Sequence, residues 1–238
     1  MILASLSLCW RELVRFFRQR SRVVGALGTP VVFWLLIGSG FDYLDYLFPG
    51  TLVQILLFAS IFSTISIIQD RNEGFLQGVL VAPVPRSAIV LGKVLGGTAI
   101  ALVQGLGFLA LAPLVGIKPS LLQVLAASGV MAIVAFGLTS LGVLLAWRFD
   151  SVQGFHGVMN LLLFPMWLLS GALFPPGKAI SWVQGAMVAD PLSYGLYALR
   201  MALGAQGGPW GVSPGVSLGI SAAFGAVMFF LAAATARR

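Results

Sequence analysis

Six long stretches of the chain are apolar and almost free of charged residues, and this pattern constrains the fold more than any other feature. They are residues 23–40, 50–69, 89–113, 122–147, 155–173 and 216–236. A helix that crosses a bilayer needs roughly 20 mostly apolar residues, so each stretch is long enough to span. Residues 52–68 alone hold eleven Leu, Ile, Val or Phe and no charge, which favours insertion by roughly 5 kcal/mol. The sequence therefore predicts an all-α integral membrane protein with six transmembrane helices.

The composition excludes the main soluble classes of protein. Only 9% of the residues are charged and 59% are hydrophobic, whereas soluble domains carry roughly 25% charged residues. A soluble enzyme, a disordered chain and a nucleic-acid-binding protein are therefore excluded, and membrane lipid is the expected surrounding. Transmembrane β-strands are excluded because the apolar runs do not alternate and are too long. The single cysteine, Cys9, rules out a disulfide framework and a cysteine-built metal site.

The distribution of Lys and Arg predicts the orientation in the membrane. With six spans, eleven of these residues fall on the side of the two termini and three, Lys118, Lys178 and Arg200, fall on the other side. Cytoplasmic loops carry the excess of positive charge. We therefore expect both termini in the cytoplasm and the chain in the cytoplasmic (inner) membrane of a bacterium.

The segment before the first span, residues 1–22, has the pattern of an amphipathic helix. Five apolar side chains from Leu6 to Phe17 fall within one arc of a helical wheel. The opposing arc holds the arginines Arg11, Arg15, Arg18 and Arg22. Such a helix lies in the membrane interface, with its apolar face in lipid and its arginines at the headgroups. It is either a topology anchor or an elbow that transmits motion into the first span, and the pattern fits both.

Several functional motifs are absent from the sequence. No Gly-x-x-x-x-Gly-Lys-[Ser/Thr] phosphate loop occurs, so any ATP, with its Mg²⁺, must be bound by another polypeptide. None of the seven acidic residues falls inside a predicted span, which argues against a proton-coupled or cation-coupled carrier. The single histidine, His156, lies far in depth from any serine that would serve as a nucleophile. We therefore expect no catalytic residue, no metal and no cofactor bound by this chain.

Pairs of small residues four positions apart recur in the predicted spans. They are Gly92 with Gly96, Gly215 with Gly219, and Ser221 with Gly225. Such spacing lets helix backbones approach closely in lipid. The pairs predict tight packing and are candidates for a contact between subunits.

The loop between the second and third stretches, residues 70–88, has an unusual order of residues. Charged residues open it, and a short helical stretch follows from residue 73 to about residue 81, with an acid at its N-terminus. Pro83 and Pro85 end that stretch, because proline lacks the amide donor and disfavours helix in the residue before it. The loop therefore predicts a short cytoplasmic helix that lies across the membrane plane.

This loop resembles that of ABC-2 type permeases, the membrane subunits of bacterial ATP-binding-cassette exporters. The similarity lies in the run Glu-Gly-Phe-Leu-Gln-Gly-Val-Leu-Val-Ala-Pro-Val-Pro-Arg from residue 73, followed by Leu-Gly-Lys. Further similarities are the arginine-rich N-terminus, the Leu-Ser-Gly-Ala-Leu-Phe-Pro-Pro run from residue 169, and Asp-Pro-Leu-Ser-Tyr from residue 190. The resemblance covers nearly the whole chain, although the family usually has Asn where Asp190 stands.

The resemblance implies a coupling helix over about residues 73–81 that docks in a groove of a cytoplasmic ATPase. The residues that match the family motif there are Glu73, Gly74, Leu76, Gly78, Leu80, Pro83 and Arg86. Because Leu76 and Leu80 are four apart, they share a face of the helix, and we expect this face to enter the groove. The alternative is that the loop only connects two spans.

The segment between the fifth and sixth stretches, residues 174–215, is too long for a turn and too apolar for a free loop. Pro175 and Pro176 open it, Trp182 supplies an interfacial aromatic ring, and Asp190 with Pro191 interrupts it. We expect either a pair of short re-entrant helices in the outer leaflet, as the resemblance also implies, or a small cap on the membrane.

The resulting domain organisation is an N-terminal helix, residues 1–22, followed by a six-helix transmembrane domain, residues 23–236. The expected function is that of the permease subunit of an ABC exporter for a drug, lipid or glycan. The expected partners are two copies of the ATPase and a second permease, either identical or related. The alternative is a non-transporting membrane scaffold or assembly factor that recruits a cytoplasmic partner.

Overall fold

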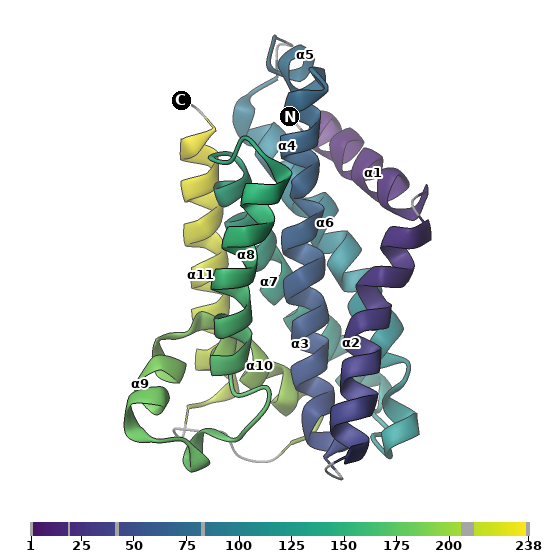
Figure 1. The fold of residues 1–238 in the computed structure, drawn as a ribbon, viewed down its shortest axis with the longest axis vertical. Coiled ribbons are helices and arrows are strands. Elements are labelled where there is room, and N and C mark those ends of the chain that lie inside the picture. Colours follow the sequence, from purple (N-terminus) through teal and green to yellow (C-terminus); the bar gives the residue numbers. More distant parts are fainter. Residues whose placement is uncertain (1, 19, 41–42, 82–83, 206–211, 237–238) are drawn as a thin grey trace.

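The computed structural model describes residues 2–18, 20–40, 43–81, 84–205 and 212–236, apart from the side chains of residues 20–27 and 80. Within these ranges the chain is helical and contains no strand (Figure 1). The α-helices are α1 Ile2–Arg18, α2 Arg20–Gly40, α3 Leu44–Ser63, α4 Ile65–Asn72, α5 Phe75–Val81, α6 Arg86–Leu109, α7 Leu121–Ala146, α8 Val152–Leu169, α9 Ser181–Ala189, α10 Pro191–Ala202 and α11 Pro214–Thr235. Two short 3-10 helices, η1 Ala112–Val115 and η2 Pro176–Lys178, complete the set.

Five segments of the described chain are long and apolar enough to cross a membrane. They are α3 together with α4 (Leu44–Asn72), α6, α7, α8 and α11. Each matches one of the predicted stretches, so the chain is a multi-pass membrane protein. The remaining stretch lies in α2, a helix of 21 residues whose described apolar part is the shorter Gly28–Gly40. The sixth span therefore stays a prediction.

Helix α3 lies at the centre of the bundle and is buried along most of its length, where it contacts α2, α6 and α7. Aromatic rings fill the core between α2, α3 and α6. The ring centroid of Trp34 lies 5.7 Å from that of Phe48 and 5.2 Å from that of Phe108. By contrast, α8 and α11 lie at the edge of the bundle and leave large apolar side chains exposed, as lipid-facing helices do.

Close helix contacts form at some of the predicted small-residue pairs. A Cβ on Gly92 or Gly96 would come within 2.8 Å of atoms of α1, so these glycines seat α1 against α6. Gly225 similarly meets Gly137 of α7, where side chains would keep the two backbones apart. A Cβ on Gly215 or Gly219 would meet nothing within 4 Å. The first and third pairs therefore pack within the chain, and only the second leaves an open face.

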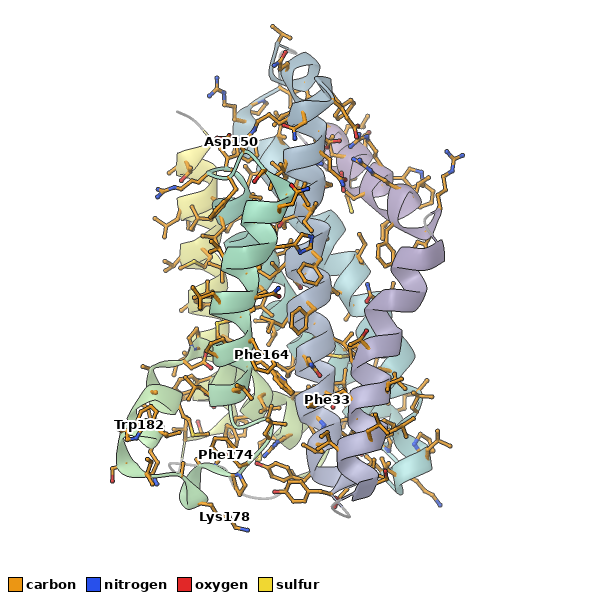
Figure 2. The ribbon with its side chains drawn as sticks, in the orientation of Figure 1. Phe33, Asp150, Phe164, Phe174, Lys178 and Trp182 are labelled. Carbon is orange, nitrogen blue, oxygen red and sulfur yellow. The ribbon has the colours of Figure 1, made fainter. Side chains whose placement is uncertain are left out.

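The N-terminal helix α1 packs obliquely against α6 at the end of the bundle that carries α5 (Figure 1). Leu6, Trp10 and Phe17 are exposed on one face, as predicted for a face in lipid. The C-terminal end of α11 lies at the same end of the molecule (Figure 1). Figure 2 shows Asp150 at this end and Lys178 and Trp182 at the opposite end.

The segment that follows α8 contains two short α-helices, α9 and α10. Most of α10 is buried, and the helix contacts α3, α7 and α11. Helix α9 lies to the side and exposes Trp182 (Figures 1 and 2). The re-entrant placement of this segment stays a prediction.

Candidate coupling network and membrane cavity

The turn between α4 and α5 depends on Gly74. This residue has a φ of +78°, a left-handed conformation that costs an L-residue with a side chain about 1–2 kcal/mol. The turn lets α5 leave the line of α4 and form the tip of the molecule (Figure 1). The helix therefore begins at Phe75, two residues later than predicted, and runs for seven residues.

Directly before this turn, Asp70 is fully buried and is held by three cations. Arg11 of α1 donates from both terminal nitrogens to its two carboxylate oxygens, at 2.9 and 2.8 Å. Arg15 donates to Asp70 Oδ1 at 2.8 Å, and Lys93 of α6 donates to Asp70 Oδ2. The hydrogen bonds to Asp70 raise the pKa of Arg11 above its ordinary value. Asp70 thus joins three helices that are distant in sequence.

A second carboxylate completes this cluster. Glu12 of α1 is buried and accepts a hydrogen bond from Lys93 Nζ at 2.7 Å. Lys93 also donates to Ser66 Oγ of α4 at 3.2 Å. We call the five ionised residues Arg11, Glu12, Arg15, Asp70 and Lys93 the ion-pair network. Because breaking a buried ion pair costs about 3–5 kcal/mol, the network holds α1, α4 and α6 together as one unit.

The other face of α4 is tied to the loop between α7 and α8 through Arg71. Its guanidinium donates to the backbone carbonyls of Trp147 at 3.0 Å and Phe149 at 3.3 Å. It also pairs with Asp150 at 3.1 Å. Carbonyls at a helix C-terminus are otherwise unsatisfied, so this arginine caps the end of α7.

The predicted interfacial arginines of α1 fall into two groups. Arg11 and Arg15 direct their guanidinium groups to the buried carboxylate of Asp70. Contact of these two arginines with lipid headgroups stays a prediction. Arg18 is exposed, as predicted, and the side chain of Arg22 lies outside the described residues.

The predicted coupling residues are distributed over different surfaces. Glu73 and Gly78 are exposed near the tip, whereas Leu76 is only 4% exposed and packs into the hydrophobic core of the chain itself. Within the chain, the bundle itself already covers Leu76, and its contact with an ATPase groove stays a prediction. Arg86 donates to the carbonyl of Ala236 at 3.0 Å and so caps α11. The side chain of Leu80 and the whole of Pro83 lie outside the described residues.

A cavity of about 490 Å³ runs from the ion-pair network into the bundle. Its walls come from α1, α2, α3, α4, α6 and α8, and Glu12 and Arg15 belong both to its lining and to the ion-pair network. Aromatic side chains form one wall, where the ring centroid of Phe62 lies 5.5 Å from that of Phe58 and 5.2 Å from that of His156. The cavity and the network thus share two residues.

The end of the molecule opposite α5 contains a second buried aspartate. Asp190 precedes α10 and caps it, since its Oδ1 accepts a hydrogen bond from the backbone N–H of Leu192 at 2.9 Å. Its Oδ2 is buried without a hydrogen-bond partner among the described residues. Burial raises the pKa of Asp190 to about 7, and the bond from Leu192 opposes this only in part.

Sequence reasoning missed the network and the cavity. Lys93 stands as a charge within an otherwise apolar pattern, and Glu12 is the one acid before Asp42 in the sequence; these are the signals that identify them in retrospect. Asp70 is one of the charged residues that open the predicted loop, and it forms the centre of the network.

The sequence matches the family of the ABC-2 type transporter over residues 4–203, which is most of the chain. The chain belongs to the ABC-2 type transporter family. One relative is the daunorubicin resistance ABC transporter permease protein DrrB1 of Streptomyces coeruleorubidus. It is 24% identical over 235 residues, which cover 94% of this chain and 82% of the relative.

Two further relatives of this ABC-2 chain carry the name nodulation protein J. The protein of Rhizobium meliloti (strain 1021) is 25% identical over 228 residues, with 91% of this chain and 86% of the relative covered. The protein of Sinorhizobium fredii (strain NBRC 101917 / NGR234) is 28% identical over 231 residues, with the same coverage. Family membership confirms the resemblance seen in the loop, and the membrane subunit of such a transporter is not itself an enzyme.

Proposed function

We propose that the chain is the permease subunit of an ABC exporter that moves a drug, lipid or glycan out across the cytoplasmic (inner) membrane of a bacterium. The chain itself binds no cofactor, and ATP with Mg²⁺ is bound and hydrolysed by two copies of a separate ATPase. A second permease, identical or related, completes the complex. Both termini and α5 face the cytoplasm, in keeping with the distribution of Lys and Arg.

The observation that carries this proposal is the position of Asp70, three residues before the exposed tip of the molecule. A force applied to α5 passes through Gly74 into α4, and the ion-pair network passes it on to α1 and α6. Arg71 passes it to the α7–α8 loop. The tip is available for contact, because Glu73 and Gly78 are exposed and Val81 is 85% exposed. This arrangement suits a coupling helix whose motion reshapes the cavity that borders the network.

The test is reconstitution of the permease with its ATPase in proteoliposomes, with the uncharged fluorescent amphiphile 6-(dimethylamino)naphthalene-2-carboxamide as the transported probe. The paired variant Glu12→Met with Lys93→Met removes one anion and one cation together, so the net charge of the ion-pair network does not change. We expect it to bind the ATPase normally and to lose most ATP-driven efflux. The control is Asp45→Asn, an exposed acid at the opposite end, which should transport normally.

Two results would contradict the proposal. Efflux at the wild-type rate by the paired variant would mean that the network does not couple the two subunits. Binding of the ATPase without ATP-driven efflux of any probe by the wild-type protein would favour the scaffold alternative.

A further inference from the structure

Two glutamine side chains deep in the cavity have hydrogen-bonding atoms without a partner. Gln54 of α3 is 8% exposed and Gln104 of α6 is 3% exposed, and both line the cavity. Gln54 Oε1 and both Gln104 Oε1 and Nε2 are buried and make no hydrogen bond to any described residue. Buried amide groups are normally paired, because leaving them unpaired is destabilising. These three atoms therefore need another explanation.

The two amides do not act as a bridge between helices. Polar side chains in membrane bundles commonly hydrogen-bond across a helix interface, and such a role would give each amide a partner on the facing helix. Here α3 and α6 are packed through other residues; for example, a Cβ on Gly105 would lie 3.0 Å from Leu56 Cδ2. Both glutamines instead belong to the lining of the cavity, and their unpaired amide atoms lie directly behind its wall.

The position of the amides places them in the membrane interior. Gln54 lies 16 residues before Asp70 along α3 and α4, which is about 24 Å at 1.5 Å per residue. Gln104 lies 11 residues after Lys93 along α6, or about 16 Å. A group at this depth is surrounded by hydrocarbon or by protein, so a molecule that binds here must bring its own hydrogen-bonding atoms.

The side chains that line the cavity limit the chemical class of the molecule that binds there. The rings of Phe58, Phe62 and His156 offer an apolar surface, and a volume of about 490 Å³ lies within the range of pockets for drug-sized ligands. The described charged residues of the wall, Glu12 and Arg15, are already paired within the ion-pair network. Nothing in the described wall is left to neutralise a charge on a ligand.

We infer that Gln54 and Gln104 form a hydrogen-bonding subsite for an uncharged amphiphile whose polar end both donates and accepts, such as a hydroxyl or a primary carboxamide. The apolar body of this molecule lies against the aromatic wall. The inference rests on the proposed export function and names the substrate class of its cavity.

The test measures binding to the permease alone, in lipid nanodiscs without ATPase or ATP. The probes are 6-(dimethylamino)naphthalene-2-carboxamide, whose fluorescence reports its environment, and its N,N-dimethylcarboxamide, which accepts hydrogen bonds but does not donate them. Empty nanodiscs give the lipid background. We expect the wild-type protein to bind the primary carboxamide about tenfold more tightly, because the N,N-dimethyl form leaves buried acceptors unpaired.

The variants are Gln54→Met and Gln104→Met, which keep the length of the side chain and remove its polar atoms. We expect each to reduce the tenfold preference, and the double variant to abolish it. The control, Gln153→Met, changes an exposed glutamine outside the cavity and should keep the full preference. Because three of the four polar atoms removed make no hydrogen bond to any described residue, the melting temperature should stay the same or rise.

A preference that persists in the double variant, or one that the wild-type protein lacks, would overturn the inference. So would a marked fall in melting temperature in both single variants relative to Gln153→Met, because it would assign the amides to packing. Failure of the proposed function is a separate result, seen as loss of ATPase binding or ATP-driven efflux in the reconstituted complex. Neither of those measurements enters the nanodisc assay.

Discussion

Two buried aspartates lie at opposite ends of the molecule, and their surroundings differ sharply. Asp70, at the end that carries α5, is paired with Arg11, Arg15 and Lys93 from two other helices. Asp190, at the opposite end, has one backbone donor and an oxygen without a hydrogen-bond partner among the described residues. The same residue type is therefore an ionised cross-link at one end and a local helix cap at the other.

This difference agrees with a division of labour between the two ends. A partner that pushes on α5 needs a rigid connection into the membrane, and paired buried charges supply it because they resist separation. The outer end needs no such connection in the proposed mechanism. A weakly held aspartate is sufficient there, since an Asp or Asn cap serves α10 equally well.

The largest expected effect is a difference in stability between variants of the two aspartates. Asp70→Asn leaves three cations facing the single carboxylate of Glu12, and we expect the free energy of unfolding to fall by about 3–5 kcal/mol. Asp190→Asn keeps the side-chain cap of α10 and should change the free energy of unfolding by less than about 1 kcal/mol. Chemical unfolding of the purified proteins in mixed micelles measures both values. Equal losses at the two sites would remove the distinction drawn here.

The next effect tests whether α5 is anchored to its own bundle. Leu76→Ala removes a buried side chain and should lower the free energy of unfolding by about 2–3 kcal/mol. Val81→Ala, on the exposed side of the same helix, should lower it by less than about 0.5 kcal/mol. If Leu76 instead faced a partner, its replacement would leave the isolated permease unchanged and would weaken only the complex with the ATPase.

The sequence predicted the helical class and the positions of most spans, because insertion into lipid depends on local hydrophobicity alone. The five confirmed segments, such as α7, begin and end within a few residues of the predicted limits. The sequence also predicted the position of α5, since Pro83 and Pro85 follow shortly after its C-terminal end. Each of these features can be read from neighbouring residues.

The ion-pair network and the cavity could not be predicted from the sequence, because they depend on contacts between residues that are distant along the chain. Arg11 and Asp70 are 59 residues apart, and Glu12 and Lys93 are 81 apart. A helical wheel places the arginines of α1 on one face but does not say what that face meets. The same reasoning applies to Leu76: its spacing from Leu80 predicts a shared face of the helix but does not show that this side chain packs into the core of its own chain.

A smaller effect is expected at the turn that connects the ion-pair network to the tip. Gly74→Ala forces a residue with a Cβ into a left-handed conformation, at a cost of about 1–2 kcal/mol. Gly78→Ala is the matched control, since Gly78 is exposed, lies within α5 and has space for a Cβ, so alanine should stabilise the helix slightly. Hydrogen exchange of the amides of α5 reads out both changes. Faster exchange in Gly78→Ala than in Gly74→Ala would contradict this account of the turn.

The smallest effect concerns the pH dependence of stability at the outer end. Because burial raises the pKa of Asp190 to about 7, the native carboxyl group holds its proton at pH values where the unfolded carboxyl group has lost it. The native state therefore binds more protons than the unfolded state between about pH 4 and pH 7, and stability falls as the pH rises through 7. Between pH 6 and pH 8 we expect a loss of about 1.4 kcal/mol from this group.

Melting temperatures at the two pH values measure this loss. Asp190→Asn should remove this part of the pH dependence, whereas the exposed Asp45→Asn should retain it. An unchanged pH dependence in Asp190→Asn would mean that this carboxyl group is ionised in the folded protein, and the two aspartates would then differ in their partners but not in their charge.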